Sequence, residues 1–343
     1  MMSDLLSWLL EPDDFAPGPR YFALRELLEK TEDDPAVRAA QKAIMTTGPV
    51  PVILENQDPQ GFWVKEGAEY GPKYRGTLWT IIFLAQLGAD GSHEQVHKGC
   101  DYVLTHYPAK EGGLSGNGRN SSLIHCLQGN LVAALIDLGW WGDERLDRAI
   151  EWLARSITGE GIALYTAKKA PVRYLRSGNS GPGFLCSAND HLPCAWGAVK
   201  ALLGLSKIPT DQRTPAVQRA IDVGVEFLFS RDPATADYPM GYAEKPSLSW
   251  FRFGYPVGYI TDILQNLEVL TALGYGGDPL LQNGIELVLS KQEADGRWQM
   301  KYSYNGKMWV DIEEKHKPSK WVTLRALRVL HRNGTWKPSG MPL

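Results

Sequence analysis

The chain has 343 residues, of which 43% are hydrophobic and 22% charged, as is ordinary for a globular protein with a large core. A formal net charge of −3 argues against a broad surface for nucleic acid or anionic membrane. The sequence has neither a run long and apolar enough for a transmembrane helix nor the pattern of a signal peptide, and four cysteines in so long a chain favour the reducing cytoplasm.

Residues 1–48 contain two short helical patterns, over residues 20–30 and 35–46. Pro35 suits the first turn of the second helix, where its missing N–H costs nothing. The segment Gly48-Pro-Val-Pro51 then breaks the chain. We therefore expect an N-terminal helical extension, residues 1–48, packed on a main domain formed by residues 49–343.

From residue 77 onward, strongly apolar helical patterns alternate with one-sided ones. Apolar helices are expected at 77–87, 123–138, 193–205, 258–273 and 320–332, and amphipathic helices at 93–106, 144–156, 215–230 and 279–291. A helix that is apolar all round must be buried, and a one-sided helix can cover it. The alternation predicts an all-α fold, an α/α toroid of five to six concentric helical hairpins. An open solenoid is the alternative, which repeat units of roughly fifty to seventy residues make less favourable.

Two of the loops that return from an outer to an inner helix share one signature. Gln57 to Trp63 and Gln292 to Trp298 both read Gln-x-x-x-Gly-x-Trp. Glycine permits the turn, tryptophan covers the end of an outer helix, and glutamine can bond free backbone groups.

This signature resembles the repeat of the squalene/oxidosqualene cyclases and of protein prenyltransferase β subunits, over about residues 50–334. The segments Leu9-Leu-Glu-Pro12 and Lys320–Leu330 also resemble bacterial single-domain members of that superfamily. The resemblance implies a toroid and an enzyme that acts on an isoprenoid or other apolar substrate in a central cavity.

The acid of class II terpenoid cyclases, Asp-x-Asp-Asp, does not occur in this sequence. Asp262 is the candidate replacement, because it forms a polar stripe with Gln265 and Asn266 on an otherwise apolar helix. The alternative is that these three side chains only make hydrogen bonds between helices, as buried polar groups usually do.

Four residues with metal-ligand chemistry lie just before an apolar helix: Cys186, Asp190, His191 and Cys194. Cys126 begins the preceding apolar helix, so parallel inner helices would bring it to the same mouth. Thiolates and imidazole are ligands that zinc prefers. Prenyltransferase β subunits hold zinc at such a mouth with an Asp-x-Cys pair, a spacing that this chain lacks.

We therefore expect a zinc site made of Cys126, Cys186, His191 and Cys194. Asp190 would be a further ligand or would hydrogen-bond a ligand, and His191 and Asp190 are also candidate catalytic residues. The alternative is that the cysteines are small buried hydrophobic residues and that no cofactor binds.

The substrate-binding residues expected from the sequence lie in three loops. Prenyltransferases place cations ahead of the zinc helix to hold a diphosphate, and Arg173 and Arg176 occupy such positions here. The aromatic residues Trp250, Tyr259 and Trp309 are expected to wall an isoprenoid or to stabilise a carbocation, and Arg252, in the same loop as Trp250, is a further expected substrate-binding residue. Packing within solvated loops is the alternative for both groups.

Two other functions stay open. A carbohydrate-active toroid, a lyase, epimerase or hydrolase, would stack sugars on these aromatics and use paired carboxylates such as Asp311 and Glu313. A non-catalytic lipid-binding scaffold would hold a structural zinc. The expected partners are an apolar small molecule and, in a homodimer, a second copy of the chain.

Overall fold

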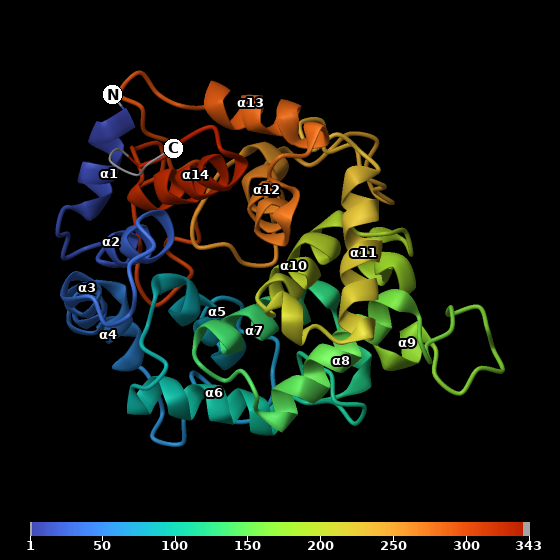
Figure 1. The fold of residues 1–343 in the computed structure, drawn as a ribbon. Helices are drawn as coiled ribbons and strands as arrows, with labels where there is room; N and C mark the ends of the chain where they lie inside the picture. The colour runs from blue at the N-terminus through green and yellow to red at the C-terminus, as the bar shows by residue number, and fades with distance from the viewer. Residues whose placement is uncertain (1, 339–343) are drawn as a thin grey trace.

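The computed structural model describes residues 2–338, in which α-helices dominate (Figure 1). The α-helices are α1 (Met2–Leu10), α2 (Gly18–Phe22), α3 (Pro35–Thr46), α4 (Pro49–Leu54), α5 (Thr77–Leu87), α6 (Glu94–His106), α7 (His125–Asp137), α8 (Glu144–Thr158), α9 (Tyr174–Ser177), α10 (Ala195–Ser206), α11 (Pro215–Phe229), α12 (Ile263–Leu270), α13 (Gln282–Ser290) and α14 (Lys320–Asn333). Two short strands, β1 (Ser180–Gly181) and β2 (Leu185–Cys186), pair antiparallel. The prediction of a helical chain is confirmed.

The long helices form two layers around one centre (Figure 1). Helices α5, α7, α10, α12 and α14 follow one another around the inside, and each contacts the next. Helices α6, α8, α11 and α13 lie outside, and each contacts the inner helix that precedes it in the chain. None of the described helices is both long and apolar enough to cross a membrane.

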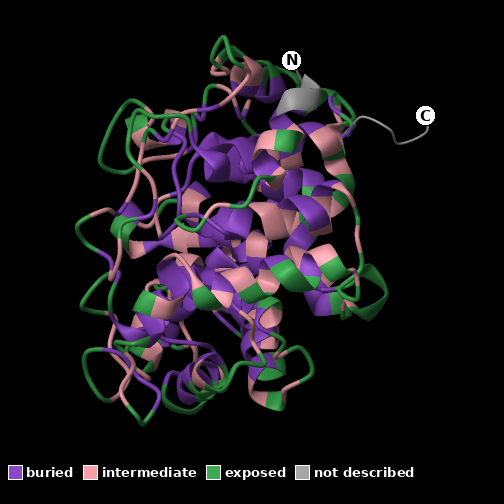
Figure 2. Ribbon diagram, turned by 90° about the vertical axis from the view of Figure 1, so that its left-hand side faces the viewer, coloured by how far each residue is buried: buried purple, intermediate pink, exposed green. Residues whose placement is uncertain are grey.

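Sequence pattern explains which helices lie inside. All but one residue of α5 is buried, as expected for a helix that is apolar all round. Helix α8 is amphipathic and buries one face, and the Asp143 side chain caps its first turn by accepting from the Arg145 backbone N–H. Viewed from the side, buried residues fill the interior, and exposed residues lie in the loops and on the outer helices (Figure 2).

Helix α2 lies where the ring closes. Its first residue, Gly18, lies so close to α14 and α5 that an added Cβ would stand 2.3 Å from the Trp321 ring and 2.8 Å from the Leu87 carbonyl oxygen. Helix α3 packs against α2. The N-terminal helices therefore contact the inner helices directly, and a domain boundary after residue 48 stays a prediction.

The two Gln-x-x-x-Gly-x-Trp loops make the same hydrogen bonds. In the first, Gln57 donates to the Gly61 carbonyl, the Trp63 indole donates to the Ile53 carbonyl at 2.9 Å, and the Trp63 backbone N–H donates to the Thr77 hydroxyl at 3.0 Å. In the second, Gln292 and Trp298 bond in the same way to Gly296, Val288 and Thr323. Each loop thus ties the end of a helix to the start of the next inner helix.

Residues 252–262, which we call the central segment, pass through the middle of the ring. The Gln86 amide of α5 bonds both the N–H and the C=O of Val257, at 2.8 and 2.9 Å. Asn130 of α7 donates to the Gly258 carbonyl at 3.1 Å, and Arg325 of α14 donates to the Gly254 carbonyl at 2.8 Å. Because these four bonds come from three inner helices, the segment is fixed across the interior.

Helices α7 and α10 make the closest contact between inner helices. A Cβ at Gly129 of α7 would lie 2.0 Å from the Lys200 carbonyl oxygen, and one at Gly204 of α10 would lie 2.8 Å from the Gly129 carbonyl oxygen. Glycine at these positions lets the two backbones touch.

We predict that Gly129→Ala destabilises the protein by about 2 kcal/mol. Alanine favours a helix by up to about 1 kcal/mol over glycine, but the new methyl group has no room, and overpacking costs about 1–3 kcal/mol or more. Gly277→Ala is the control, because nothing lies within 4 Å of its added Cβ. Urea unfolding measures both variants, and equal stabilities would contradict the close contact.

Candidate functional site

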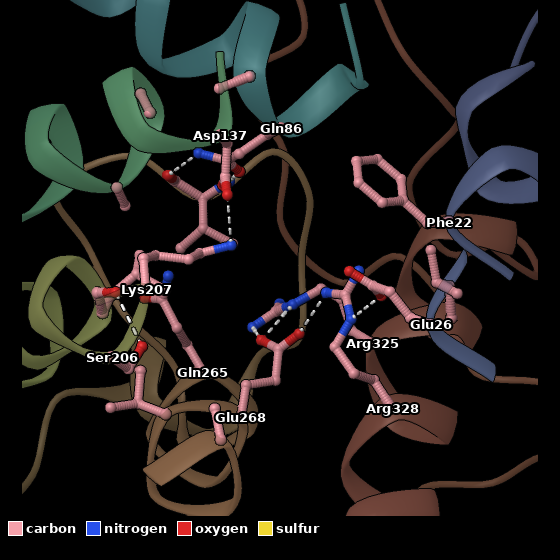
Figure 3. Close-up of a pocket in the computed structure, with 18 of the residues that line it drawn as sticks. Phe22, Glu26, Gln86, Asp137, Ser206, Lys207, Gln265, Glu268, Arg325 and Arg328 are labelled. Atoms are coloured by element: carbon pink, nitrogen blue, oxygen red, sulfur yellow. Dashed lines mark hydrogen bonds and ion pairs between the residues drawn. The ribbon is translucent and has the colours of Figure 1, made fainter. Parts of the chain in front are cut away.

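A cavity of about 400 Å³ lies at the C-terminal ends of the inner helices (Figure 3). Gln86 of α5, Asp137 of α7 and Ser206 of α10 line it, and each is the last or next-to-last residue of its helix. Tyr255 and Val257 of the central segment also line it. The inner helices thus share one direction, and the central segment borders the cavity.

Much of the cavity wall is apolar. It includes Phe22, Ile82, Leu203, Val269 and Leu324, as well as Trp321. The Tyr255 ring stacks on Trp321 with centroids 4.1 Å apart, and its hydroxyl donates to the Gln86 carbonyl. Such a wall favours an apolar ligand.

A buried ionic network forms another part of the wall (Figure 3). The Arg325 guanidinium donates to both carboxylate oxygens of Asp262 at 2.9 Å and to Glu268 Oε2 at 2.7 and 2.9 Å. Arg328 donates to Glu268 Oε1 at 3.0 Å and to Glu26. Burial raises the pKa of Glu268, but Arg325 and Arg328 outweigh it, so the net shift is downward. These charges compensate one another.

Arg332 is the exception among the cavity cations. Lys207 pairs with Asp137 at 2.8 Å, whereas no carboxylate of the described chain lies within 4.0 Å of the Arg332 guanidinium. The guanidinium of Arg332 donates a 3.5 Å hydrogen bond to the Glu268 carbonyl. Surrounding protein and the charge of Arg328 lower the pKa of Arg332. Arg332 is nevertheless an exposed residue, so its guanidinium is open to an anion from solution.

Lys200 lies just behind the cavity wall. Its side chain is 0% exposed, and its amino group donates to the side-chain oxygen of Gln265, which lines the cavity. Burial lowers the pKa of Lys200 to about 7; the nearby charges of Asp262, Arg325, Cys126 and Glu268 act on it as well.

The predicted polar stripe of α12 makes hydrogen bonds between elements. Asp262 caps α12 and pairs with Arg325, Gln265 accepts from Lys200, and Asn266 donates to the Tyr238 hydroxyl at 3.2 Å. Both Asp262 oxygens are engaged. The role of Asp262 as an acid stays a prediction, and it requires release from Arg325.

The structure brings three predicted metal ligands together at the opposite end of the ring, near the first turns of α7 and α10. A hydrogen bond between the Cys186 and Cys194 thiols lowers the pKa of Cys186 and raises that of Cys194. The charge of Cys126 would interact with both. These interactions place Cys126 near the other two cysteines.

The fourth predicted ligand, His191, faces elsewhere. Its Nδ1 contacts the Tyr174 hydroxyl, its ring stacks on Tyr165 with centroids 4.6 Å apart, and Asp190 is exposed. Within residues 2–338, no group of three or more His, Cys, Asp or Glu side chains is placed to hold a metal ion. The four-ligand set is therefore not assembled in this conformation, and zinc stays a prediction.

None of the six predicted substrate-binding residues lines the central cavity. Arg173 and Arg176 lie at α9 on the periphery (Figure 1). Trp250 packs on Tyr238, and Arg252 is exposed. Tyr259 packs near Trp79 and Trp196, in the first turns of α5 and α10. The Trp309 indole donates to the Arg75 carbonyl at 3.1 Å.

The sequence predictions do not include Arg325, Arg328, Arg332 or Glu268. The arginines recur at intervals of three and four along an otherwise apolar helix, which places them on one face. That spacing, with a glutamate in another apolar helix, is the signal that could have found the network.

Comparison with known proteins gives matches to solved structures alone. No protein-family model and no curated protein matches the sequence. Apo type II terpene cyclase MstE from Scytonema matches with a TM-score of 0.32 and 14% identity, over 83% of this chain and 96% of that chain.

Two complexes of MstE variants match similarly, each over 83% of this chain and 95% of that chain. One contains the product merosterolic acid A (TM-score 0.35, 14% identity), and the other the substrate geranylgeranyl dihydroxybenzoate (TM-score 0.35, 13% identity). The chain is thus similar in structure to a terpenoid cyclase over most of its length, at low sequence identity.

We predict that Arg325→Met destabilises the protein by about 3–5 kcal/mol, because it leaves buried Asp262 without its cation and leaves Glu268 with Arg328 alone. Arg332→Met on the same helix is the matched control, and it should change the stability by less than about 0.5 kcal/mol. Chemical denaturation of both variants tests this, and a small loss for Arg325→Met would show that the network contributes little.

The lowered pKa of Lys200 predicts a pH dependence of stability. Between about pH 7 and about pH 10, the unfolded chain holds the Lys200 proton and the folded chain does not, so the free energy of unfolding rises with pH by up to about 1.4 kcal/mol per unit. The increment is lost as the pH falls to about 7. Urea unfolding at several pH values across this range measures the free energy of unfolding. Its increase with pH should be smaller for Lys200→Met than for wild type, and equal increases would contradict the prediction.

Proposed function

We propose that the protein is an enzyme of the terpenoid-cyclase and prenyltransferase kind, which takes an isoprenoid or similar apolar substrate with an anionic end into the central cavity. The observation that carries this proposal is the combination, in one cavity, of an apolar wall with the guanidinium of Arg332, an exposed residue that has no carboxylate of the described residues within 4.0 Å. The cavity volume of about 400 Å³ falls within the ordinary range for small-molecule sites.

Each part of the cavity has a distinct role in this proposal. Arg332 binds a carboxylate or diphosphate, since a guanidinium can donate two parallel hydrogen bonds to such a group. Phe22, Tyr255 and Trp321 contact the hydrocarbon and stabilise positive charge that develops on it. The neutralised network of Arg325 and Glu268 fixes these helices without attracting a second anion.

We also propose that the fold is the repeat toroid of this superfamily, with five to six hairpins and Gln-x-x-x-Gly-x-Trp loops. The equal hydrogen bonding of the loops at Trp63 and Trp298 supports this. At the opposite end, zinc on Cys126, Cys186 and Cys194 stays a separate proposal, in which the metal would supply a Lewis acid. His191 could join it only by leaving Tyr174. Metal analysis of wild type and of Cys194→Ala tests this part.

The cavity argues against the carbohydrate alternative. Its carboxylates, Glu26, Asp137 and Glu268, are each paired with a cation. Glu313 caps α14 by accepting from Ser319 and from the Lys320 N–H at 2.9 Å, and neither it nor Asp311 lines the cavity. A lipid-binding scaffold would use the same cavity, so binding without turnover would favour that role.

We predict that the protein binds farnesoic acid more tightly than farnesol, and that Arg332→Met weakens acid binding about tenfold while leaving farnesol binding unchanged. Quenching of tryptophan fluorescence, with Trp321 in the cavity wall, measures both affinities. Arg176→Met is the matched control, because the sequence predicts the anion site there.

If Arg176→Met weakens farnesoic acid binding and Arg332→Met does not, the anion binds at the other end of the ring. Binding of neither compound would overturn the proposed function.

A further inference from the structure

Lys200 is a buried amine that the proposed function does not use. It lies on inner helix α10 with its side chain 0% exposed. Its amino group donates a hydrogen bond to Gln265, and no carboxylate of the described residues lies within 4.0 Å of that group. A charged amine is costly in such a place, because neither water nor a close counter-ion compensates it. The site therefore favours the neutral amine.

The charged groups around Lys200 act on its pKa in both directions, and burial outweighs them. Asp262 and Glu268 of α12 favour the charged form, and Arg325 of α14 opposes it. Cys126 of α7 would favour it only as a thiolate, and burial raises the pKa of that thiol to about 12. Burial of Lys200 itself is the largest influence, and it lowers the pKa to about 7. A large fraction of the amine is thus unprotonated near neutral pH, which is the nucleophilic form.

One side chain separates this amine from the cavity. Gln265 lines the cavity wall, between Lys207 and Glu268 in the close-up view (Figure 3). Its side-chain oxygen accepts from Lys200 and, at 2.6 Å, from the Thr261 hydroxyl. For the Lys200 nitrogen to reach a ligand in the cavity, the Gln265 amide would have to rotate away from it.

We propose that Lys200 is a nucleophile of the central cavity, which forms an imine with an aldehyde or ketone group of an apolar ligand. The inference rests on the proposed function in one respect, that the cavity accepts an apolar ligand.

The reaction needs no further reagent. The lone pair of the neutral nitrogen attacks the carbonyl carbon, and the C–N bond forms as the π pair of C=O moves to oxygen. A first proton passes from nitrogen to that oxygen and gives a carbinolamine. The second proton of the nitrogen follows as the C–O bond breaks, so the oxygen leaves as water while the nitrogen lone pair forms C=N. Amine and carbonyl thus give imine and water without oxidation or reduction. The apolar wall limits the return of water, which favours the imine.

The test traps the imine on the whole protein. Wild type is incubated near neutral pH with citral, an isoprenoid aldehyde, and reduced with borohydride, and each lysine is quantified by peptide mass spectrometry. Lys200 should be labelled at least about tenfold more than exposed lysines, whose ordinary pKa is about 10.4. Geranic acid, which has the same carbon skeleton and no aldehyde, should suppress the labelling.

Two variants give matched controls. The Lys200→Met variant should show no label at position 200. Lys207 lines the same cavity but pairs with Asp137, so the Lys207→Met variant should still be labelled at Lys200. The wild-type pH profile is a readout that needs no variant. Labelling of Lys200 should be half-maximal near pH 7, whereas exposed lysines should label only at markedly higher pH.

Unlabelled Lys200 beside labelled surface lysines would overturn the imine proposal, whatever the cavity binds. If geranic acid still binds in that case, the proposed function stands. Failure of geranic acid to bind would count against the proposed function itself.

Discussion

The contacts of one buried arginine organise the interior of the ring. Arg325 joins α14 to Asp262 and Glu268 of α12 and to the carbonyl of Gly254 in the central segment. Buried ion pairs often add little net stability, since each charge must lose its water. Their geometry, however, fixes which elements meet. Here the pairing holds the central segment across the ring, and that segment is one wall of the cavity.

The position of the central segment makes the two ends of the ring different. At the N-terminal ends of the inner helices, aromatic rings pack closely: Tyr74 stacks on Tyr304 with centroids 4.2 Å apart, and Tyr259 lies near Trp79 and Trp196. At the C-terminal ends, the about 400 Å³ cavity remains. The cavity therefore lies beside the arginine network and away from the thiols.

Local pattern predicts the helices well and the site poorly, for physical reasons. Glycine after the last turn, as at Gly88 in the left-handed region, and aspartate before the next helix, as at Asp143, are chemical signals that act within a few residues. The cavity depends instead on how residues 252–262 thread the ring, through bonds from Gln86 and Asn130 that lie more than a hundred residues away. Parallel inner helices do bring the first turns of α7 and α10, which carry Cys126 and follow Cys194, to one end of the ring, but no metal-holding group forms there among the described residues. The sequence does not fix the direction of His191, which Tyr174 determines.

The shared direction of the inner helices also explains the charges at each end. Helix N-termini carry partial positive charge and favour thiolates, whereas C-termini carry partial negative charge and favour cations. Arg332 lies in the last turn of α14, and Lys207 follows the last residue of α10. The helix ends thus help to keep Arg332 charged without a carboxylate beside it. The same carbonyl ends repel an anionic ligand, so binding of an anion at this end of the ring must depend on that one guanidinium far more than on the net charge of the cavity.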